Sequence, residues 1–444
     1  MSKNQWSSKF SFIITTSAFA IGLGNIWRFP YVAGEGGGAA FILVYIVLMF
    51  LIGIPILTIE IALGRMSNTT ILLGFGKMVK KNNWNGIGWL GTVSCILIMG
   101  FYVMIMAWIA IYLWECLSGE ISRLPVSEIT GHFDGVASNL PMVITVILTI
   151  MLIVFFVVRQ GLKNGLERYA KVMMFGLIIL MIGLCIWAAT LNGASEGYHW
   201  LLSPDFSKIN FRIIMNALGQ LFFSVGVGMA VAFVFGSYTN KNENLVNSTT
   251  WIVLADTFFA LLAGLMLFPA IFSFNLQPDS GPNLIFVTMA TVFNQLEHGW
   301  AIGTLFFLLL FLAGFTSLIS CIQGLKDTFK DKYNLSDAIA LLLVIGCIIG
   351  IAILAVFSYS DNPLLLFGKT VFETLDYTTS TMLLPLSGLL TAVFAGHIIG
   401  FDKLRLHLLT GTKTLKIRAY WKVILLWVLP LALLIILING LFNT

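Results

Sequence analysis

The residues of this chain most able to do chemistry are ionisable side chains set in very apolar segments. Asp256 lies in "IVLADTFFALLAG" and Arg28 lies in "GNIWRFP", and both segments are otherwise almost entirely hydrophobic. A carboxylate at the centre of a membrane helix costs about 2.5 to 3.5 kcal/mol on insertion scales, so by default it faces a cavity and has a partner. Asp256 is therefore expected to line an internal site, and a buried ion pair with Arg28 is the structural alternative.

Paired glycines interrupt two of the apolar segments. Gly22 and Gly24 begin the stretch "GLGNIWRFPYVAGEGGG", and Gly226 and Gly228 interrupt "LGQLFFSVGVGMAVAF" much later in the chain. Unwound backbone is tolerated in a bilayer only where it lines a cavity, and its free N–H and C=O groups can bind anions and cations. One glycine pair alone is more typical of close helix packing. Two interrupted segments at corresponding places favour the binding site of a transporter.

Composition places all of these residues in a membrane. Of 444 residues, 58% are hydrophobic and only 10% are charged, and the mean hydropathy of +0.95 excludes a water-soluble globular protein. Segments of about 20 apolar residues predict eleven membrane helices. The predicted spans are 10–35, 39–64, 87–117, 140–158, 166–190, 212–236, 247–275, 300–325, 336–357, 366–398 and 419–441. Alternating strands typical of a membrane barrel are not apparent, so the fold class is an all-α integral membrane bundle.

The distribution of positive charge predicts the orientation in the cell membrane. A cytoplasmic N-terminus puts most of the 25 Lys and Arg residues on the inside, and eleven spans then leave the C-terminus outside. The net charge of +5 is thus a topology signal, and nucleic acid is excluded as a partner. The five cysteines and five histidines do not cluster, so neither a disulfide framework nor a metal or nucleophilic site built on histidine is expected.

The chain is expected to form one transmembrane domain, residues 1–444. The only long loops are predicted at about 118–139 and 191–211, together with the segment 276–299, which should form short helices on the outer surface. Membrane lipid is an expected partner, no organic cofactor is expected, and the predicted state is a monomer or a weak dimer.

Three stretches, "GLGNIWRFPYVAGEGGGAAF", "GQLFFSVGVG" and "AGFTS", resemble the neurotransmitter:sodium symporter family, and specifically its bacterial amino-acid branch. The resemblance covers the chain from about Trp6 to its end. It implies a five-plus-five inverted repeat with broken helices 1 and 6, over about 10–190 and 212–398, and one extra C-terminal helix over about 419–441. It also implies sodium-coupled import of a hydrophobic or aromatic L-amino acid by alternating access.

The resemblance assigns a substrate site to the two breaks. The substrate carboxylate would be held by the backbone N–H groups of Leu23 and Gly24 and by the hydroxyl of Tyr102. Gly22 stands where monoamine carriers of the family have an aspartate, so the substrate should bring its own carboxylate as a zwitterion. The ammonium would lie against the carbonyl groups of Ala20, Phe223, Ser224 and Gly226. The rest of the pocket would be lined by Ile98, Met229, Ser317, Ser320 and Cys321, which form an apolar and adaptable surface.

The resemblance also implies two bound sodium ions, each held by hard oxygen ligands. The first site would use Ala20, Asn25, Ser224 and Asp256, together with the substrate carboxylate. The second would use Ala18, Ile21, Ala313, Thr316 and Ser317.

Chloride is not expected to be required. Many relatives have an asparagine at the position of Asp256 and a serine one turn later, where this chain has Ala260. The chain keeps the other three chloride-binding types, at Tyr45, Gln220 and Ser224. Asp256 can supply the missing negative charge, so transport should be chloride-independent, with Asp256 able to take a proton on the return leg.

Charged pairs are implied as gates on both sides of the site. Arg28 and Asp376 match the outer pair, with Phe223 and Tyr102 as an aromatic lid. On the cytoplasmic side Trp6 and Asp331 match the inner gate, and Lys3 replaces the arginine of the family. Glu60 is expected to be a structural acid bonded to the broken sixth helix.

One departure from the family concerns the fifth helix. Gly165 is followed ten residues later by Phe175, where many members have a proline that helps the helix unwind.

Three other functions are alternatives to transport. A channel would need polar faces along several helices, and a membrane enzyme would need clustered acid–base or metal-binding residues. An amino-acid-binding membrane sensor without net transport stays open.

Overall fold

The structure is a computed structural model of the chain, and it describes residues 5–278, 281–360, 362–411 and 419–442. Within these residues, nine helices are long and apolar enough to cross a membrane, or ten if the bent pair formed by Lys9–Ala20 and Gly24–Glu35 is one span. Helices predominate because backbone groups in a bilayer must be paired within the protein, and an α-helix pairs them all locally. The predicted all-α bundle is confirmed.

In the element labels, α marks an α-helix and η a short 3₁₀- or π-helical segment. The first half of the chain is mainly helical. The membrane-embedded elements are α1 (Lys9–Ala20), η1 (Gly24–Arg28), α2 (Phe29–Glu35), α3 (Ala39–Leu48), η2 (Met49–Gly53), α4 (Ile54–Ser67), α6 (Asn85–Ser118), α8 (Leu140–Arg159), η6 (Leu162–Glu167) and α9 (Arg168–Ala189). The connecting elements are α5 (Ile71–Val79), η3 (Asn82–Trp84), η4 (Ile121–Arg123), η5 (Val126–Glu128), α7 (Ile129–Ser138), α10 (Ala194–Leu202) and η7 (Phe206–Lys208).

The second half of the chain is also mainly helical. Its membrane-embedded elements are α11 (Phe211–Ser224), α12 (Val231–Ser237), α13 (Leu245–Ser273), α15 (Gly299–Tyr333), α16 (Asp337–Val356), α17 (Val371–Tyr377), η10 (Thr378–Leu383), α18 (Leu384–Val393), η11 (Phe394–Gly400), α20 (Ala419–Val423), η12 (Ile424–Val428) and α21 (Leu429–Phe442). Its connecting elements are η8 (Leu284–Met289), α14 (Ala290–Gln295), η9 (Phe357–Tyr359), β1 (Leu365–Leu366), β2 (Lys369–Thr370) and α19 (Phe401–Leu409).

Both predicted helix breaks are present. The axis turns by 59° between Lys9–Ala20 and Gly24–Glu35. Residues 225–230 separate α11 from α12, and neither of these two helices is long enough to span a bilayer alone. Gly226, Gly228 and Ala230 all have a positive φ in this segment, of 63°, 81° and 68°. Glycine adopts that backbone region without steric cost, which explains why two of the three positions are glycine.

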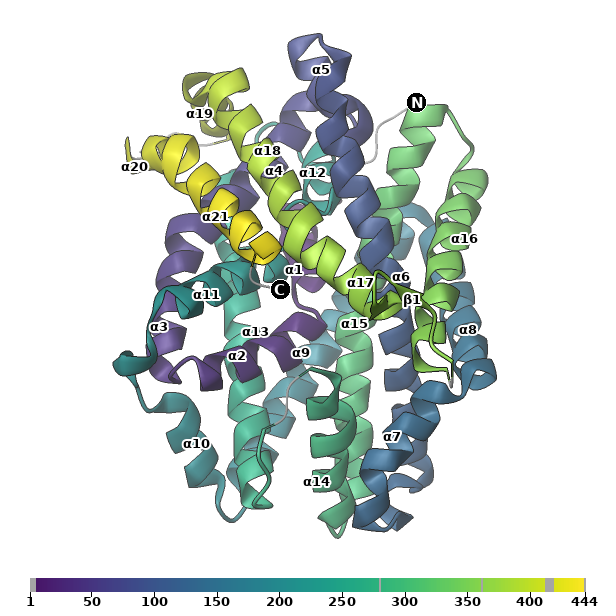
Figure 1. Ribbon diagram of the computed structural model, residues 1–444. Helices are drawn as coiled ribbons and strands as arrows, with labels where there is room; N and C mark the ends of the chain where they lie inside the picture. The colour runs from purple at the N-terminus through teal and green to yellow at the C-terminus, as the bar shows by residue number, and fades with distance from the viewer. Residues whose placement is uncertain (1–4, 279–280, 361, 412–418, 443–444) are drawn as a thin grey trace.

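The broken helices are held between continuous ones. The two longest helices, α6 and α15, pack along each other beside α16 and α9 (Figure 1). On the other side of the breaks, α12 packs against α4, and α1 packs against α13. The rigid neighbours thus fix the position of each unwound segment, which is a requirement for a site built from backbone groups.

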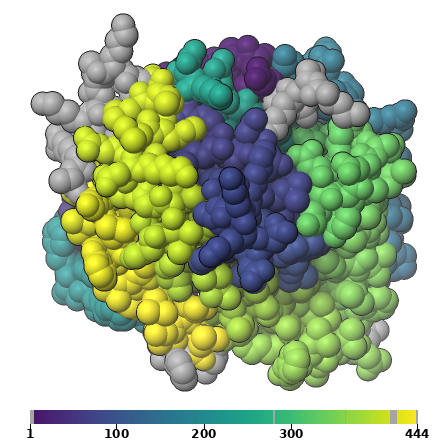
Figure 2. Space-filling view, turned by 90° about the horizontal axis from the view of Figure 1, so that it is seen from above, coloured from purple at the N-terminus to yellow at the C-terminus, as the bar shows by residue number. Residues whose placement is uncertain are grey.

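The connecting elements divide between the two ends of the bundle. In Figure 1 the N-terminal end of α1, α5 and α19 lie at the top, and α7, α10 and α14 lie at the bottom. Figure 2 shows the top end, where α5 (blue) lies between the yellow C-terminal helices and the green helices α15 and α16. The loops that the charge count puts outside the cell thus share one end, and the N-terminal helix begins at the other.

Two boundaries differ from the sequence prediction. The tenth span was expected from residue 366, but β1 and β2 form a hairpin there and the helix begins at Val371. Phe367 and Gly368 form the turn with positive φ angles of 54° and 81°. The helix predicted over 300–325 continues as α15 to Tyr333, because its polar last turns pack in the protein. The predicted short helices within 276–299 are present as η8 and α14.

Candidate functional site: a cavity between the two helix breaks

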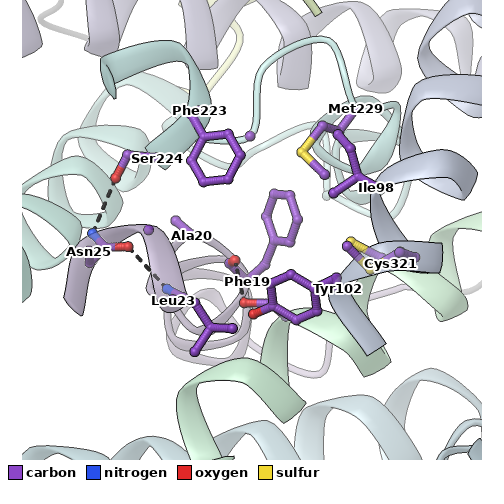
Figure 3. A pocket seen from close by; sticks show the side chains of 15 residues that line it. Phe19, Ala20, Leu23, Asn25, Ile98, Tyr102, Phe223, Ser224, Met229 and Cys321 are labelled. Atoms are coloured by element: carbon purple, nitrogen blue, oxygen red, sulfur yellow. Dashed lines mark hydrogen bonds between the residues drawn. The ribbon is translucent and has the colours of Figure 1, made fainter. Parts of the chain in front are cut away.

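A cavity of about 50 Å³ lies where the two unwound segments face each other. Its walls are Phe19, Ala20, Gly22, Leu23, Gly24, Asn25, Ile98, Met99, Tyr102, Phe223, Ser224, Gly226, Met229, Ser317 and Cys321. In Figure 3, Asn25 and Ser224 lie on one side of the cavity, and Ile98, Met229 and Cys321 lie on the opposite side. The cavity is therefore polar at one end and apolar at the other.

The polar end is built from the break in the first helix. α1 ends at Ala20, and Ile21 adopts an extended conformation with φ −73° and ψ 98°. The N–H group of Gly22 donates to Asn25 Oδ1 at 3.1 Å, so a side chain replaces the lost helical bond. The hydroxyl of Tyr102 lies beside Ser317 and the backbone of Leu23. The structure thus brings Tyr102 to the start of the second half-helix, where the N-terminal end of the helix dipole favours an anion.

The apolar end is shaped by two aromatic rings and the glycines beneath them. A Cβ atom at Gly24 would lie 2.6 Å from the ring of Phe223, and one at Gly226 would lie 2.5 Å from the ring of Phe19. Side chains at either position would displace a ring, so glycine is required for the rings to close over the cavity. The size of the pocket therefore depends on these two glycines.

The cavity differs in four residues from the set predicted for the substrate site, and one of the four, Asn25, was predicted for the first sodium site. Ser320 is absent from its walls, and the Ser320 hydroxyl donates to the Thr316 carbonyl at 2.7 Å on its own helix. Phe19 and Met99 line the cavity although the sequence analysis did not name them. Each is the neighbour in sequence of a predicted residue, Ala20 or Ile98, and that adjacency is the only signal that could have pointed to them.

Asp256 is fully buried beside the polar end, at 0% exposure. Its Oδ1 accepts from Asn25 Nδ2 at 2.7 Å, and the Ser224 hydroxyl lies 2.8 and 2.9 Å from its two carboxylate oxygens. Tyr45 lies next to Ser224 and Asp256. Arg28 and Asp256, both in the described part of the chain, make no ion pair within 4.0 Å, so the alternative of a buried Arg28–Asp256 pair is not what the structure shows.

A second cluster of oxygen atoms joins α1 to α15. The Thr316 hydroxyl lies 2.9 Å from the carbonyl oxygens of both Ala18 and Ala313. The Ser317 hydroxyl lies 3.0 Å from the Phe19 carbonyl and 3.3 Å from that of Ala313. Four of the five residues named for the second sodium site therefore lie within hydrogen-bonding distance of one another. Ile21, the fifth, is fully buried at the end of α1.

A larger cavity of about 350 Å³ adjoins the first one on the side of α2. Leu23, Gly24, Tyr102 and Phe223 line both cavities, so Tyr102 and Phe223 form the partition between them. Arg28 stacks over Phe223, with its guanidinium carbon 5.1 Å from the ring centroid. Arg28 and Asp376 both line the larger cavity, but these two described residues make no ion pair within 4.0 Å.

The opposite side is closed by the segment before α1. The indole nitrogen of Trp6 donates to the Phe235 carbonyl at 3.1 Å, and the Trp6 N–H donates to the Tyr238 carbonyl at 3.3 Å. The Trp6 ring packs edge-on against both of those aromatic rings. Asp331 lies near Tyr238, whereas Lys3 lies outside the described residues. Trp6 therefore fastens the N-terminal segment to α12.

Glu60 has the structural position that the sequence predicts. It is 2% exposed, and its Oε2 accepts from the N–H group of Gly228 at 3.1 Å. A carboxylate that accepts from a broken helix satisfies a donor that would otherwise be buried without a partner.

Two facing helix breaks, an internal cavity and oxygen clusters on either side define the class of secondary transporter whose binding site lies near the middle of the membrane. The model of the sodium:neurotransmitter symporter family matches residues 3–133 and 126–444, and the chain belongs to this family. Its members are sodium-dependent transporters and not enzymes, so the alternative of a membrane-embedded enzyme is set aside.

Individual relatives agree with this assignment. The chain is 36% identical over 98% of its length to the uncharacterized sodium-dependent transporter YhdH of Bacillus subtilis, of which it covers 97%. It is 32% identical over 99% of its length to an uncharacterized sodium-dependent transporter of Haemophilus influenzae, of which it covers 98%. Among solved structures, MhsT in complex with L-phenylalanine matches with a TM-score of 0.89 and 32% identity, over 99% of this chain and 100% of that one.

Proposed function

We propose that this protein imports a hydrophobic or aromatic L-amino acid across the cell membrane by sodium-coupled alternating access. Its N-terminus would be cytoplasmic, as the distribution of Lys and Arg favours, and eleven spans would then put the C-terminus outside. The observation that carries the proposal is the cavity between the two breaks, which has backbone groups and Tyr102 at one end and apolar side chains at the other. An amino acid has the same division between its charged and its apolar parts.

The space at Gly22 supports a zwitterionic substrate. A Cβ atom at this position would lie 3.0 Å from the Ser317 hydroxyl and 3.5 Å from that of Tyr102. A side chain at this position would therefore be tightly packed against Ser317, which supports a glycine there and a substrate that brings its own negative charge. The match to a structure that contains L-phenylalanine supports an aromatic side chain at the apolar end, between Phe19, Ile98 and Met229.

Two sodium ions are proposed as co-transported cargo. The ligands present are carbonyl, hydroxyl, amide and carboxylate oxygens, which suit a hard cation. The first site would lie between Asn25, Ser224 and Asp256, whose polar atoms already contact one another. The substrate carboxylate would complete it, so each ligand raises the affinity of the other by the same factor. Two inward charges contribute roughly 4.6 kcal/mol per 100 mV of membrane potential.

Chloride independence is proposed from the position of Asp256. The carboxylate is buried among Asn25, Ser224 and Tyr45, and Ala260, one turn further along α13, is also fully buried but has no polar group. Asp256 would thus supply a negative charge in the region where many relatives bind chloride. A sodium ion beside it would have an internal counter-ion.

An equilibrium binding screen tests this function. The purified protein would be titrated with each of the twenty amino acids in sodium, lithium or potassium salts of chloride and of gluconate. The expected result is sodium-dependent binding of phenylalanine, tyrosine, tryptophan or leucine that is equal in the two anions. Binding of a charged or amine-only ligand, or a loss of binding in gluconate, would contradict the proposal.

A further inference from the structure

The inner half of α1 contains buried hydroxyl groups that have no bonding partner. Thr15, Thr16 and Ser17 are 0 to 3% exposed, and within the described part of the chain none of their hydroxyls has a hydrogen-bond partner. Many threonines elsewhere in the bundle behave differently, although Thr70 and Thr257 are also unpaired among the described residues. Those at positions 58 and 249, for example, donate to the carbonyl group four residues earlier, as is usual in membrane helices. Unpaired buried hydroxyls cost free energy, so their presence calls for a role.

Thr15 belongs to a row of oxygen atoms along one face of α1. Ser11 lies four residues before it and Ala18 three residues after it, and this spacing puts all three on the same side of the helix. The rise of an α-helix puts them about 6 Å and about 4.5 Å apart along its axis. Ser11 and Thr15 are fully buried. We call Ser11, Thr15 and the carbonyl group of Ala18 the hydroxyl row.

The end of the hydroxyl row nearer the cavity, at Ala18, is the proposed second sodium site. The Ala18 carbonyl is one of the oxygens that the Thr316 hydroxyl contacts, at 2.9 Å. An ion that leaves this site toward the cytoplasm therefore meets Thr15 next, because Thr15 is the nearest polar side chain on that face of α1.

At the other end of the hydroxyl row, near the start of α1, lies a buried carboxylate. Ser11 Oγ lies 2.6 Å from Ser7 Oγ, and the Ser7 hydroxyl in turn donates to Glu167. The N–H group of Ser7 also donates to Glu167, at 3.0 Å. Glu167 is 1% exposed, and its one cationic partner among the described residues is Lys171, at 3.5 Å.

We propose that the hydroxyl row is the exit route of the sodium ion from the second site to the cytoplasm, with Glu167 at its mouth. The inference rests on the proposed sodium site. A cation that loses its ligands in an apolar bundle pays a large desolvation cost, and the oxygen atoms of the row would replace those ligands in turn. Of the two hydroxyls in the row, that of Thr15 has no partner among the described residues, and that of Ser11 contacts Ser7. The Glu167 carboxylate attracts the ion at the cytoplasmic end, where Ser7 and Lys171 give way to water when the N-terminal segment moves. The route does not need the proline that α9 lacks.

The test compares three variants reconstituted in proteoliposomes with L-phenylalanine as the probe. Thr15→Val keeps the shape but removes the oxygen, Thr15→Ser keeps the oxygen, and Thr149→Val is the control. Thr149 is an exposed threonine of α8 that bonds within its own helix. We expect Thr15→Val to slow sodium-driven uptake about tenfold, the effect of one lost oxygen contact to a cation. The sodium dependence of binding should stay within twofold of wild type, and Thr15→Ser and Thr149→Val should transport normally.

The route is overturned if Thr15→Val transports at the wild-type rate, or if Thr15→Ser is as slow as Thr15→Val. If Thr15→Val fails to fold, Ser11→Ala tests the same row. It should slow sodium-driven uptake while the sodium dependence of binding stays within twofold of wild type, and uptake at the wild-type rate would overturn the route. Thr316→Val separates this inference from the proposed function. It should weaken sodium-dependent binding itself, and if it does not, the second sodium site is wrong and the route falls with it.

Discussion

Asp256 illustrates how a single ionisable residue is accommodated in a membrane protein. Its carboxylate is fully buried, and its partners are the Asn25 amide and the Ser224 hydroxyl, both of which belong to broken helices. Neutral donors stabilise the charge without cancelling it. The negative charge therefore remains available to a cation at the polar end of the cavity.

Asp256→Asn is expected to lower the apparent sodium affinity for uptake by about tenfold, because it removes a charge that one sodium ion would contact. In Asp256→Asn with Ala260→Ser, the pattern of the chloride-binding relatives is restored, and uptake should become chloride-dependent. Uptake rates in chloride and in gluconate measure both effects. If the single variant keeps the sodium dependence of the wild type, Asp256 does not contribute to the first sodium site.

Sequence reasoning at this scale succeeded where the residue type itself carries the signal. A carboxylate in an apolar helix and a pair of glycines that interrupts one are unusual enough in the sequence to single out Asp256 and Gly226 before any coordinates. It missed Phe19 and Met99 because an apolar residue in an apolar helix does not reveal which face lines a cavity. It also named Ser320, which is not among the residues that line the cavity and whose hydroxyl bonds back to its own helix.

At the scale of elements, the contact between α4 and α12 is close enough to exclude side chains. A Cβ atom at Gly64 would lie 1.8 Å from the Phe233 carbonyl oxygen, and one at Gly236 would lie 2.0 Å from that of Ile61. Helices in membranes pack through such small residues because lipid offers no hydrophobic driving force for their association. This contact fixes α12, and with it one edge of the sixth-helix break.

Gly64→Ala and Gly236→Ala should therefore each destabilise the protein by about 1 to 3 kcal/mol, since backbone atoms cannot move aside as a side chain can. Gly183→Ala in α9 is the matched control, because a Cβ atom there would meet nothing within 4 Å. Thermal unfolding in detergent measures the difference. Equal melting temperatures for the Gly64 and Gly183 variants would show that α4 and α12 are not in backbone contact.

At the end of the bundle that carries α10 and α14 (Figure 1), α7 is tied to the end of α6 by His132. Its Nε2 lies 3.0 Å from Glu115 Oε2, and this hydrogen bond raises the pKa of His132 above its ordinary value of 6.5. A raised folded pKa means that the stabilisation is complete below pH 6.5 and is lost as the pH rises through the folded pKa. The effect is small because the His132 side chain is partly exposed to solvent, at 19%.

The melting temperature in detergent should therefore fall by about 1 °C between pH 6 and pH 9 through this contact. His132→Gln keeps a polar side chain that cannot titrate, and it should abolish that part of the pH dependence. An identical pH dependence of wild type and His132→Gln would show that the contact does not titrate in this range.

Element types were predictable, but not every boundary. The breaks in the first and sixth helices follow from Gly22, Gly24, Gly226 and Gly228. The hairpin at 365–370 was missed because "LLLFG" is as apolar as the helices around it, although Phe367 is 99% exposed. Hydropathy reports the average environment of a window, and it does not resolve a turn whose apolar side chain lies outside the core.

At the scale of the whole molecule, the two sides of the cavity differ. On the side of α2 a large cavity adjoins it, and Arg28 and Asp376 line that cavity without forming an ion pair within 4.0 Å. On the side of α12 the Trp6 bonds and a buried network close the protein. In that network the Tyr238 hydroxyl donates to Asp327, and Lys326 lies 3.4 Å from the Asp327 carboxylate. Alternating access requires that such contacts break on one side while they form on the other.

The measurement that tests the central claim most directly is accumulation in proteoliposomes. Radiolabelled L-phenylalanine would be followed with an inward sodium gradient, with equal sodium on both sides, and with potassium in place of sodium. A transporter should concentrate phenylalanine above the external level only with the gradient, and a sodium ionophore should release it. Sodium-dependent binding that never exceeds one ligand per protein, with no concentration in the lumen, would contradict coupled transport and favour a sensor.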